Sequence, residues 1–155
     1  MPLIRRRVIR TLAFGALACG LGVSRAEAAQ CTLTSTSVAF GGYNVFFPVP
    51  TDTIGTITYR CNGGAKNVVL TISAGQAGTD SPRTLGGPSN ERLVYNLYRD
   101  AGRTAVWGSN VSQGAALADP SNSTDETLTI FGRIPAGQDV RAGTYSDNVS
   151  VTLNF

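Results

Sequence analysis

The C-terminal stretch YSDNVSVTLNF, residues 145–155, alternates polar and apolar side chains with the two-residue period of a half-buried β-strand. From residue 149 onward one face carries only apolar side chains, and these belong to Val149, Val151, Leu153 and Phe155. The opposite face carries asparagine, serine and threonine. Successive side chains of a strand point to opposite sides, so this stretch predicts a core-facing final strand in an all-β domain.

The same alternation recurs along the chain, and no stretch shows the 3.6-residue period of an amphipathic helix. Residues 56–61, 67–73, 92–99 and 127–133 are therefore predicted strands. Glycine- and proline-containing stretches between them, such as 41–42, 48–50 and 86–88, predict turns. This spacing indicates an immunoglobulin-like β-sandwich of six to seven strands.

The first predicted strand changes its alternation part-way. Cys31 and Leu33 share one parity, whereas Val38 and Phe40 share the other. A bulge or break at residues 35–37 would let both pairs face the core. First strands that switch between sheets are typical of immunoglobulin-like sandwiches.

The first 28 residues have the features of a signal peptide, which predicts export. Four arginines precede an apolar stretch, residues 11–23, that is too short to cross a bilayer as a helix. Small residues at Ala26 and Ala28 place cleavage after Ala28, and residues 29–155 then form one domain. Two variants stay open: twin-arginine export, because Arg5 to Arg10 loosely match that signal, and lipidation at Cys19.

Charge gives no support to a nucleic-acid or membrane partner. Five of the 13 lysines and arginines, but only one of the 10 acidic residues, lie within residues 1–28. The exported domain therefore keeps eight basic and nine acidic residues, a net charge of −1. The basic pI of about 9.0 belongs to the signal peptide, and no basic face for an anionic partner is expected.

Two cysteines remain after cleavage, Cys31 and Cys61, and an exported chain is expected to join them in a disulfide. Closing a loop of about 30 residues stabilises the folded chain by roughly 3–4 kcal/mol on the chain-entropy model. A metal site is not expected, because the chain has no histidine and no CxxC pair.

The sequence predicts no catalytic residues, cofactor or small-molecule substrate. Without histidine, the usual acid–base group and the common catalytic triads are absent. Two carboxylates meeting across the fold, as in a glycosidase, remain the enzymatic alternative. A sugar-binding module would need stacked aromatic residues in a polar, concave site.

An aromatic cluster, Tyr43, Phe46 and Phe47, lies in the predicted loop 41–50. Packing over one end of the sandwich is the expected arrangement, because exposed apolar patches are uncommon. The alternative is an exposed loop that contacts a surface or a partner. Trp107 is expected in the core for the same reason.

Three stretches in their order and spacing resemble the spore coat protein U domain family, which includes subunits of archaic chaperone–usher pili. They are VAFGGY at residues 38–43, LVYNLYRDAGR at 93–103 and FGRIPAGQ at 131–138. The resemblance covers nearly the whole exported domain. It implies an exported, surface-located structural subunit and not an enzyme.

The resemblance also implies an immunoglobulin-like sandwich that lacks its final strand. A periplasmic chaperone, and later a neighbouring pilus subunit at the outer-membrane usher, would insert the missing strand. Val149, Val151, Leu153 and Phe155 would then line the acceptor groove. Only Ala29 and Gln30 would precede Cys31 after cleavage, so a tip or cap subunit that accepts a strand without donating one is expected. The alternative is a self-contained cell- or spore-surface coat protein with paired strands and no open groove.

Overall fold

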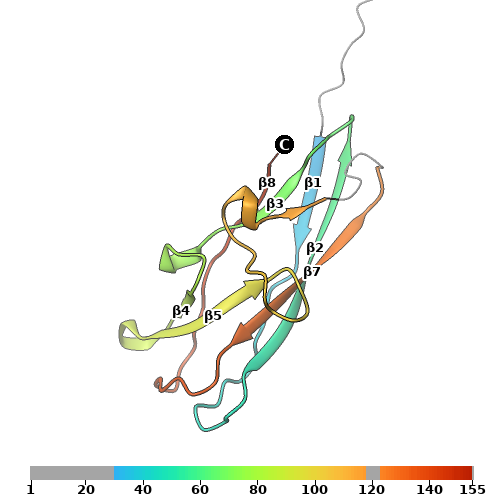
Figure 1. The fold of residues 1–155 in the computed structure, drawn as a ribbon. Coiled ribbons are helices and arrows are strands. Elements are labelled where there is room, and N and C mark those ends of the chain that lie inside the picture. Colours follow the sequence, from blue (N-terminus) through green and yellow to red (C-terminus); the bar gives the residue numbers. More distant parts are fainter. Residues whose placement is uncertain (1–29, 118–122, 155) are drawn as a thin grey trace, which may run out of the picture.

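The structure, a computed structural model of the chain, describes residues 30–117 and 123–154. Its strands form two antiparallel sheets (Figure 1). The larger sheet has the order β1 (Gln30–Ser35), β2 (Thr51–Asn62), β7 (Glu126–Ile134), β5 (Arg92–Tyr98) and β4 (Arg83–Gly86). The smaller has the order β6 (Ala115–Ala116), β3 (Val69–Ile72) and β8 (Val151–Asn154). Short 3₁₀ turns, η1 (Gly75–Ala77), η2 (Pro88–Asn90) and η3 (Val111–Gln113), connect them. The fold is the predicted all-β, immunoglobulin-like sandwich.

The alternating positions found in the sequence supply the core between the two sheets. On β5, Leu93, Tyr95 and Leu97 are all buried, as the alternation predicts. Trp107 is also buried, which confirms its expected place in the core, and its indole N–H donates to the Leu70 carbonyl at 2.8 Å. That bond satisfies the polar atom that burying an indole would otherwise leave unpaired.

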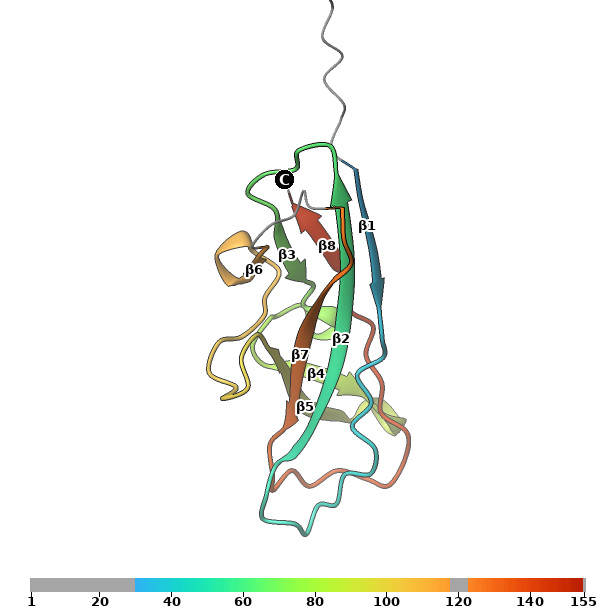
Figure 2. The same ribbon diagram turned by 90° about the vertical axis from the view of Figure 1, so that its right-hand side faces the viewer.

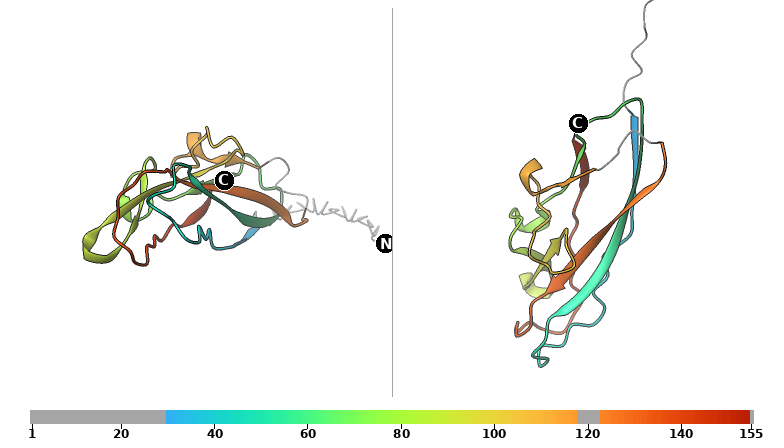
Figure 3. Two further views of the ribbon diagram at one scale, coloured as in Figure 1. Left: turned by 90° about the horizontal axis from the view of Figure 1, so that it is seen from below. Right: turned by 45° about the vertical axis from the view of Figure 1, so that its right-hand side comes forward.

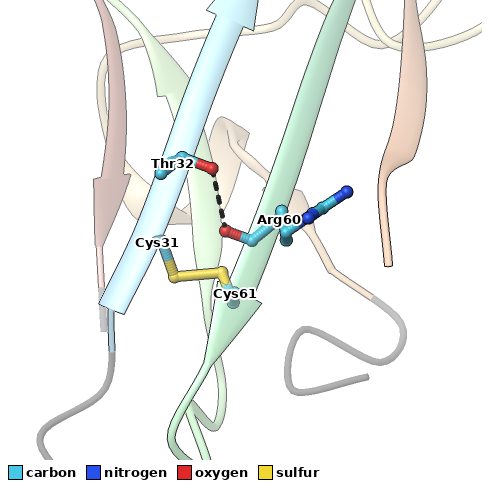
Figure 4. Close-up of a disulfide and its surroundings, with 4 residues drawn as sticks. All are labelled: Cys31, Thr32, Arg60 and Cys61. Atoms are coloured by element: carbon cyan, nitrogen blue, oxygen red, sulfur yellow. Dashed lines mark hydrogen bonds between the residues drawn. A yellow bond between two sulfur atoms is a disulfide. The ribbon is translucent and has the colours of Figure 1, made fainter. Parts of the chain in front are cut away.

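Cys31 and Cys61 form the expected disulfide, and they are directly opposite each other in the β1–β2 ladder (Figure 4). The hydroxyl of Thr32 donates to the Arg60 carbonyl beside it, at 3.5 Å. β1 is an edge strand whose strand neighbour in the larger sheet is β2. The disulfide therefore fixes the start of edge strand β1 to the end of β2.

The final predicted strand, 145–155, is only partly paired. Its second half forms β8, which pairs with β3 so that Leu153 lies opposite Leu70. In its first half, Ser146 makes an isolated bridge to Gly86 at the end of β4. The segment thus passes from the edge of the larger sheet to the smaller sheet. It therefore does not form one continuous ladder with a single neighbouring strand. The short strands β4 and β6 were not predicted, which raises the strand count to eight among the described residues.

Gln30 and the end of β8 lie at the same end of the domain (Figures 1 and 2). Loop 41–50 lies at the opposite end. The turn that follows β7 lies at the same end as this loop (Figure 3), and Tyr43 is hydrogen-bonded to Gln138 there.

A buried arginine links the two sheets. Arg83 on β4 is fully buried, and its guanidinium donates to the carbonyls of Ile72 and Trp107, at 3.0 and 2.8 Å. It also donates to the Ser73 carbonyl at 3.0 Å and to the Asn96 side-chain oxygen at 2.8 Å. Ile72 ends β3 in the smaller sheet, so one side chain satisfies acceptors where the sheets meet.

Replacing Arg83 with alanine should lower the free energy of unfolding by about 3 kcal/mol or more, because several buried acceptors lose their donor. Urea unfolding of the full chain, followed by the fluorescence of Trp107, measures this. The exposed Arg92 on the neighbouring strand is the control, and Arg92→Ala should change stability by less than about 0.5 kcal/mol. Equal midpoints for the two variants would contradict the role given to Arg83.

Candidate binding groove

An open groove of about 1070 Å³ runs between two extended segments of the chain. Residues 35–45 form one side, called here the N-terminal wall. Residues 140–149 and Val151 form the other side, called the C-terminal wall. The floor comes from the larger sheet and consists of Leu85, Leu93, Tyr95, Leu97 and Ile134.

Two glycines hold the N-terminal wall against the larger sheet. A Cβ at Gly55 of β2 would lie 2.8 Å from the Val38 side chain, and one at Gly132 of β7 would lie 2.9 Å from Phe40. Such contacts are too short for real Cβ atoms, so each glycine leaves the space that an apolar wall residue fills. The wall therefore crosses the inner face of β2 and β7. The predicted break at 35–37 is confirmed, because Thr36 bonds Thr56 partly through its hydroxyl.

Gln138 fastens the far end of the N-terminal wall to the floor. Its side-chain amide accepts from the backbone N–H of Val94 at 2.7 Å and donates to the carbonyl of Val94 at 2.9 Å. An amide side chain thus pairs with β5 as a neighbouring strand would. The backbone N–H of Gln138 in turn donates to the Tyr43 hydroxyl at 2.8 Å, which ties the wall to the same point.

The C-terminal wall is held by side chains at two levels. Glu91, beside β5, accepts from the Arg141 N–H at 2.6 Å and from the Tyr145 hydroxyl at 2.9 Å. The Arg141 N–H holds the pKa of Glu91 below its usual range, with the Tyr145 hydroxyl adding to the effect. Farther along, Asp147 accepts from the hydroxyl of Tyr95 on the floor, at 2.7 Å.

Tyr95 connects both walls across the floor. Its ring meets the edge of Phe40 from the N-terminal wall, with centroids 5.8 Å apart and planes at 74°. Its hydroxyl donates to Asp147 on the other wall. Burial raises the pKa of the Tyr95 phenol well above its usual range, and the neighbouring Asp147 carboxylate raises it further. The phenol therefore keeps its proton and remains the donor.

The groove lies between strands that are paired on one side. Among the described residues, β1 is hydrogen-bonded to β2 and β8 to β3, and each is the edge of its sheet. The backbone groups on the outer side of an edge strand can pair with another strand. An extended chain lying between the two walls would reach the two edge strands at Ser35 of β1 and Val151 of β8.

The sequence profile of the spore coat protein U domain family matches residues 19–152. The chain belongs to this family. Protein U of Myxococcus xanthus is 30% identical over 126 residues, which is 81% of this chain and 56% of Protein U. The chain therefore spans little more than half the length of that relative.

A solved structure shares the fold of this spore coat protein U domain. It is a chaperone–tip adhesion subunit pre-assembly complex from the archaic chaperone–usher Csu pili of Acinetobacter baumannii. The match has a TM-score of 0.59 and 19% sequence identity, and it covers 83% of this chain and 40% of the other. At this identity the likeness establishes the fold alone.

The structure places the predicted site residues of this domain in different surroundings. Val149 and Val151 line the groove, whereas Leu153 packs on the core beyond it. Phe155 lies outside the described residues. In the aromatic cluster, Tyr43 is half-buried in the N-terminal wall, while Phe46 and Phe47 are 88% and 59% exposed. The expected packing of the cluster over the sandwich therefore holds for Tyr43 only.

Among residues 30–117 and 123–154, no three acidic or cysteine residues gather closely enough to hold a metal ion. Within the same ranges, no helix has the length and apolar character needed to span a membrane. Sequence reasoning missed Gln138 and Asp147 as groove residues, although Gln138 lies in the stretch FGRIPAGQ and Asp147 interrupts an apolar row.

Proposed function

We propose that this chain is an exported structural subunit of a surface pilus, and that its groove accepts an extended strand from another protein. A periplasmic chaperone would supply the strand first. A neighbouring subunit would replace it during assembly at an outer-membrane usher. The observation that carries this proposal is the open groove with an apolar floor between the segments that continue two edge strands. The chain's family and its likeness to a structure from archaic pili support it.

The groove has the dimensions and chemistry of a strand site. The C-terminal wall and β8 together are extended from Tyr145 to Asn154, about 33 Å at 3.3 Å per residue. Their groove-side residues are half-buried, which leaves apolar surface for a partner to cover. A strand inserted there would gain main-chain hydrogen bonds from the edges and specificity from alternate side chains.

A carboxylate placed among the apolar side chains of the groove should block strand binding. Val149→Asp should reduce copurification with the cognate periplasmic chaperone at least tenfold, because a charge would be buried against apolar side chains without a partner. Ser150→Asp is the matched control, since Ser150 is the adjacent residue and is exposed on the opposite face. Equal recovery of chaperone with both variants would remove the support for a strand-accepting groove.

A self-contained surface coat protein is the second candidate. The chain's membership of the spore coat protein U domain family favours this function. That function needs a sandwich whose strands are complete without a partner. The open groove counts against it. A purified chain that is monomeric, stable and indifferent to the chaperone would favour the coat protein.

Export and position in the fibre are further parts of the proposal. The Cys31–Cys61 disulfide supports an oxidising compartment. The intact mass of the exported protein should correspond to a chain that begins at Ala29, with both cysteines oxidised. Such a chain would carry two residues before Cys31, too few to complete a neighbour, and would occupy a tip or cap position. A mass that retains residues before Ala29 would contradict this assignment.

Loop 41–50 is a proposed contact with an apolar surface. Phe46, Phe47 and Val49 are 88%, 59% and 60% exposed, and residues 38–51 carry no charge. The loop lies at the end of the domain away from Gln30 and β8 (Figure 2). Protruding apolar side chains without a neighbouring charge suit an apolar, featureless surface better than a polar receptor.

Replacing both Phe46 and Phe47 with serine should reduce retention on a hydrophobic resin severalfold, without changing the urea midpoint or chaperone binding. Val111→Ser is the control, because Val111 is 56% exposed but belongs to η3 elsewhere in the fold. If the Val111 variant lost retention as much as the double variant, the effect would reflect general surface apolarity and not this loop.

A further inference from the structure

Between Tyr145 and Val151, Asp147 is the one charged residue in the row of side chains that the C-terminal wall turns toward the groove. Tyr145, Val149 and Val151 flank it in the same row, and all four are half-buried, while the residues between them are exposed. On the floor, Tyr95 likewise separates Leu93 from Leu97. In this row Val149 and Val151 lie on one side of Asp147 and Tyr145 on the other, so Asp147 and Tyr95 form a polar level within the groove.

The carboxylate of Asp147 is held in a fixed orientation. Oδ1 accepts from the backbone N–H of Gln76 at 2.8 Å and of Asn148 at 2.8 Å, and Oδ2 accepts from Tyr95 at 2.7 Å. Gly75 admits this arrangement, because a Cβ there would collide with the carboxylate and because its φ of +66° suits glycine. Phe40 supports Tyr95 from the opposite wall.

At this level the groove presents the Asp147 carboxylate as an acceptor. A carboxylate has about four acceptor positions, and the three bonds above leave one of them open. The phenol proton of Tyr95 is already given to Asp147. A large apolar side chain placed here would remove water from the carboxylate without replacing its hydrogen bond, which is unfavourable. A short donor side chain would satisfy it.

We propose that Asp147 selects the strand that enters the groove, by accepting a hydrogen bond from a serine or threonine at the one inward position that passes it. The other inward positions of the strand would be apolar. Tyr95, Phe40 and Gly75 act as positioning residues. This inference rests on the proposed strand-accepting function and adds a sequence requirement to it.

A threonine scan tests the inference on the full exported chain. Labelled eleven-residue peptides carry valine at every inward position and lysine or threonine outward, and one inward valine at a time is replaced by threonine. Threonine and valine have nearly the same shape, so affinity reports the hydroxyl. Fluorescence anisotropy should show one position at which threonine binds about tenfold tighter than valine, and weaker binding at the other positions.

Asp147→Ala should abolish the preference at that position and leave the other positions unchanged, whereas Asp139→Ala, at an exposed acid, should preserve it. If Asp147→Ala does not fold, the scan on the wild-type chain decides alone. Peptides that bind with no preferred threonine position would overturn the role of Asp147 and leave the groove function intact. Failure of every peptide to bind would overturn both proposals.

Discussion

Backbone hydrogen bonding at a sheet edge is the constraint on which this molecule depends. β1 and β8 are each paired on one side, and the groove lies between the segments that extend them. A strand edge beside an apolar groove favours pairing with another chain. The remaining features of the domain keep these two edges in place, so that a partner strand meets a formed site and not a collapsed one.

The walls are held by side chains and glycines instead of by ladders. Because Gly55 and Gly132 have no side chain, Val38 and Phe40 can pack directly against the backbone of β2 and β7. The N-terminal wall therefore lies close to the sheet. Gln138 pairs with Val94 through its side-chain amide, in place of a neighbouring strand. Because none of these contacts uses the groove-side backbone of β8, they leave that edge available to a partner.

Much of this arrangement could be predicted from alternation alone, because alternation reports which face of a strand is buried. It gave the inward faces of β5 and β8 and the break after β1. The pairing of Cys31 with Cys61 was predicted instead from the cysteine count of an exported chain. Contacts between distant side chains leave no periodic signal. For this reason the sequence did not predict that Arg83 links the two sheets or that the Gln138 side chain pairs with the backbone of Val94. The members of the aromatic cluster differ in burial for a similar reason. The Tyr43 hydroxyl accepts a hydrogen bond from Gln138, whereas the Phe46 side chain is exposed, and composition alone cannot distinguish the two.

A partner strand that completes this sandwich at the groove would protect backbone amides that are open in the isolated chain. Amide hydrogen exchange, measured on the full exported chain alone and in complex with its periplasmic chaperone, detects this protection. Within residues 36–43 and 145–154, the amides that have no hydrogen bond inside the chain should exchange rapidly in the isolated protein and become protected in the complex, with little change in the β2–β7 ladder. Strong and equal protection of these amides in both states would contradict a completing partner strand, because the sandwich would then be complete on its own.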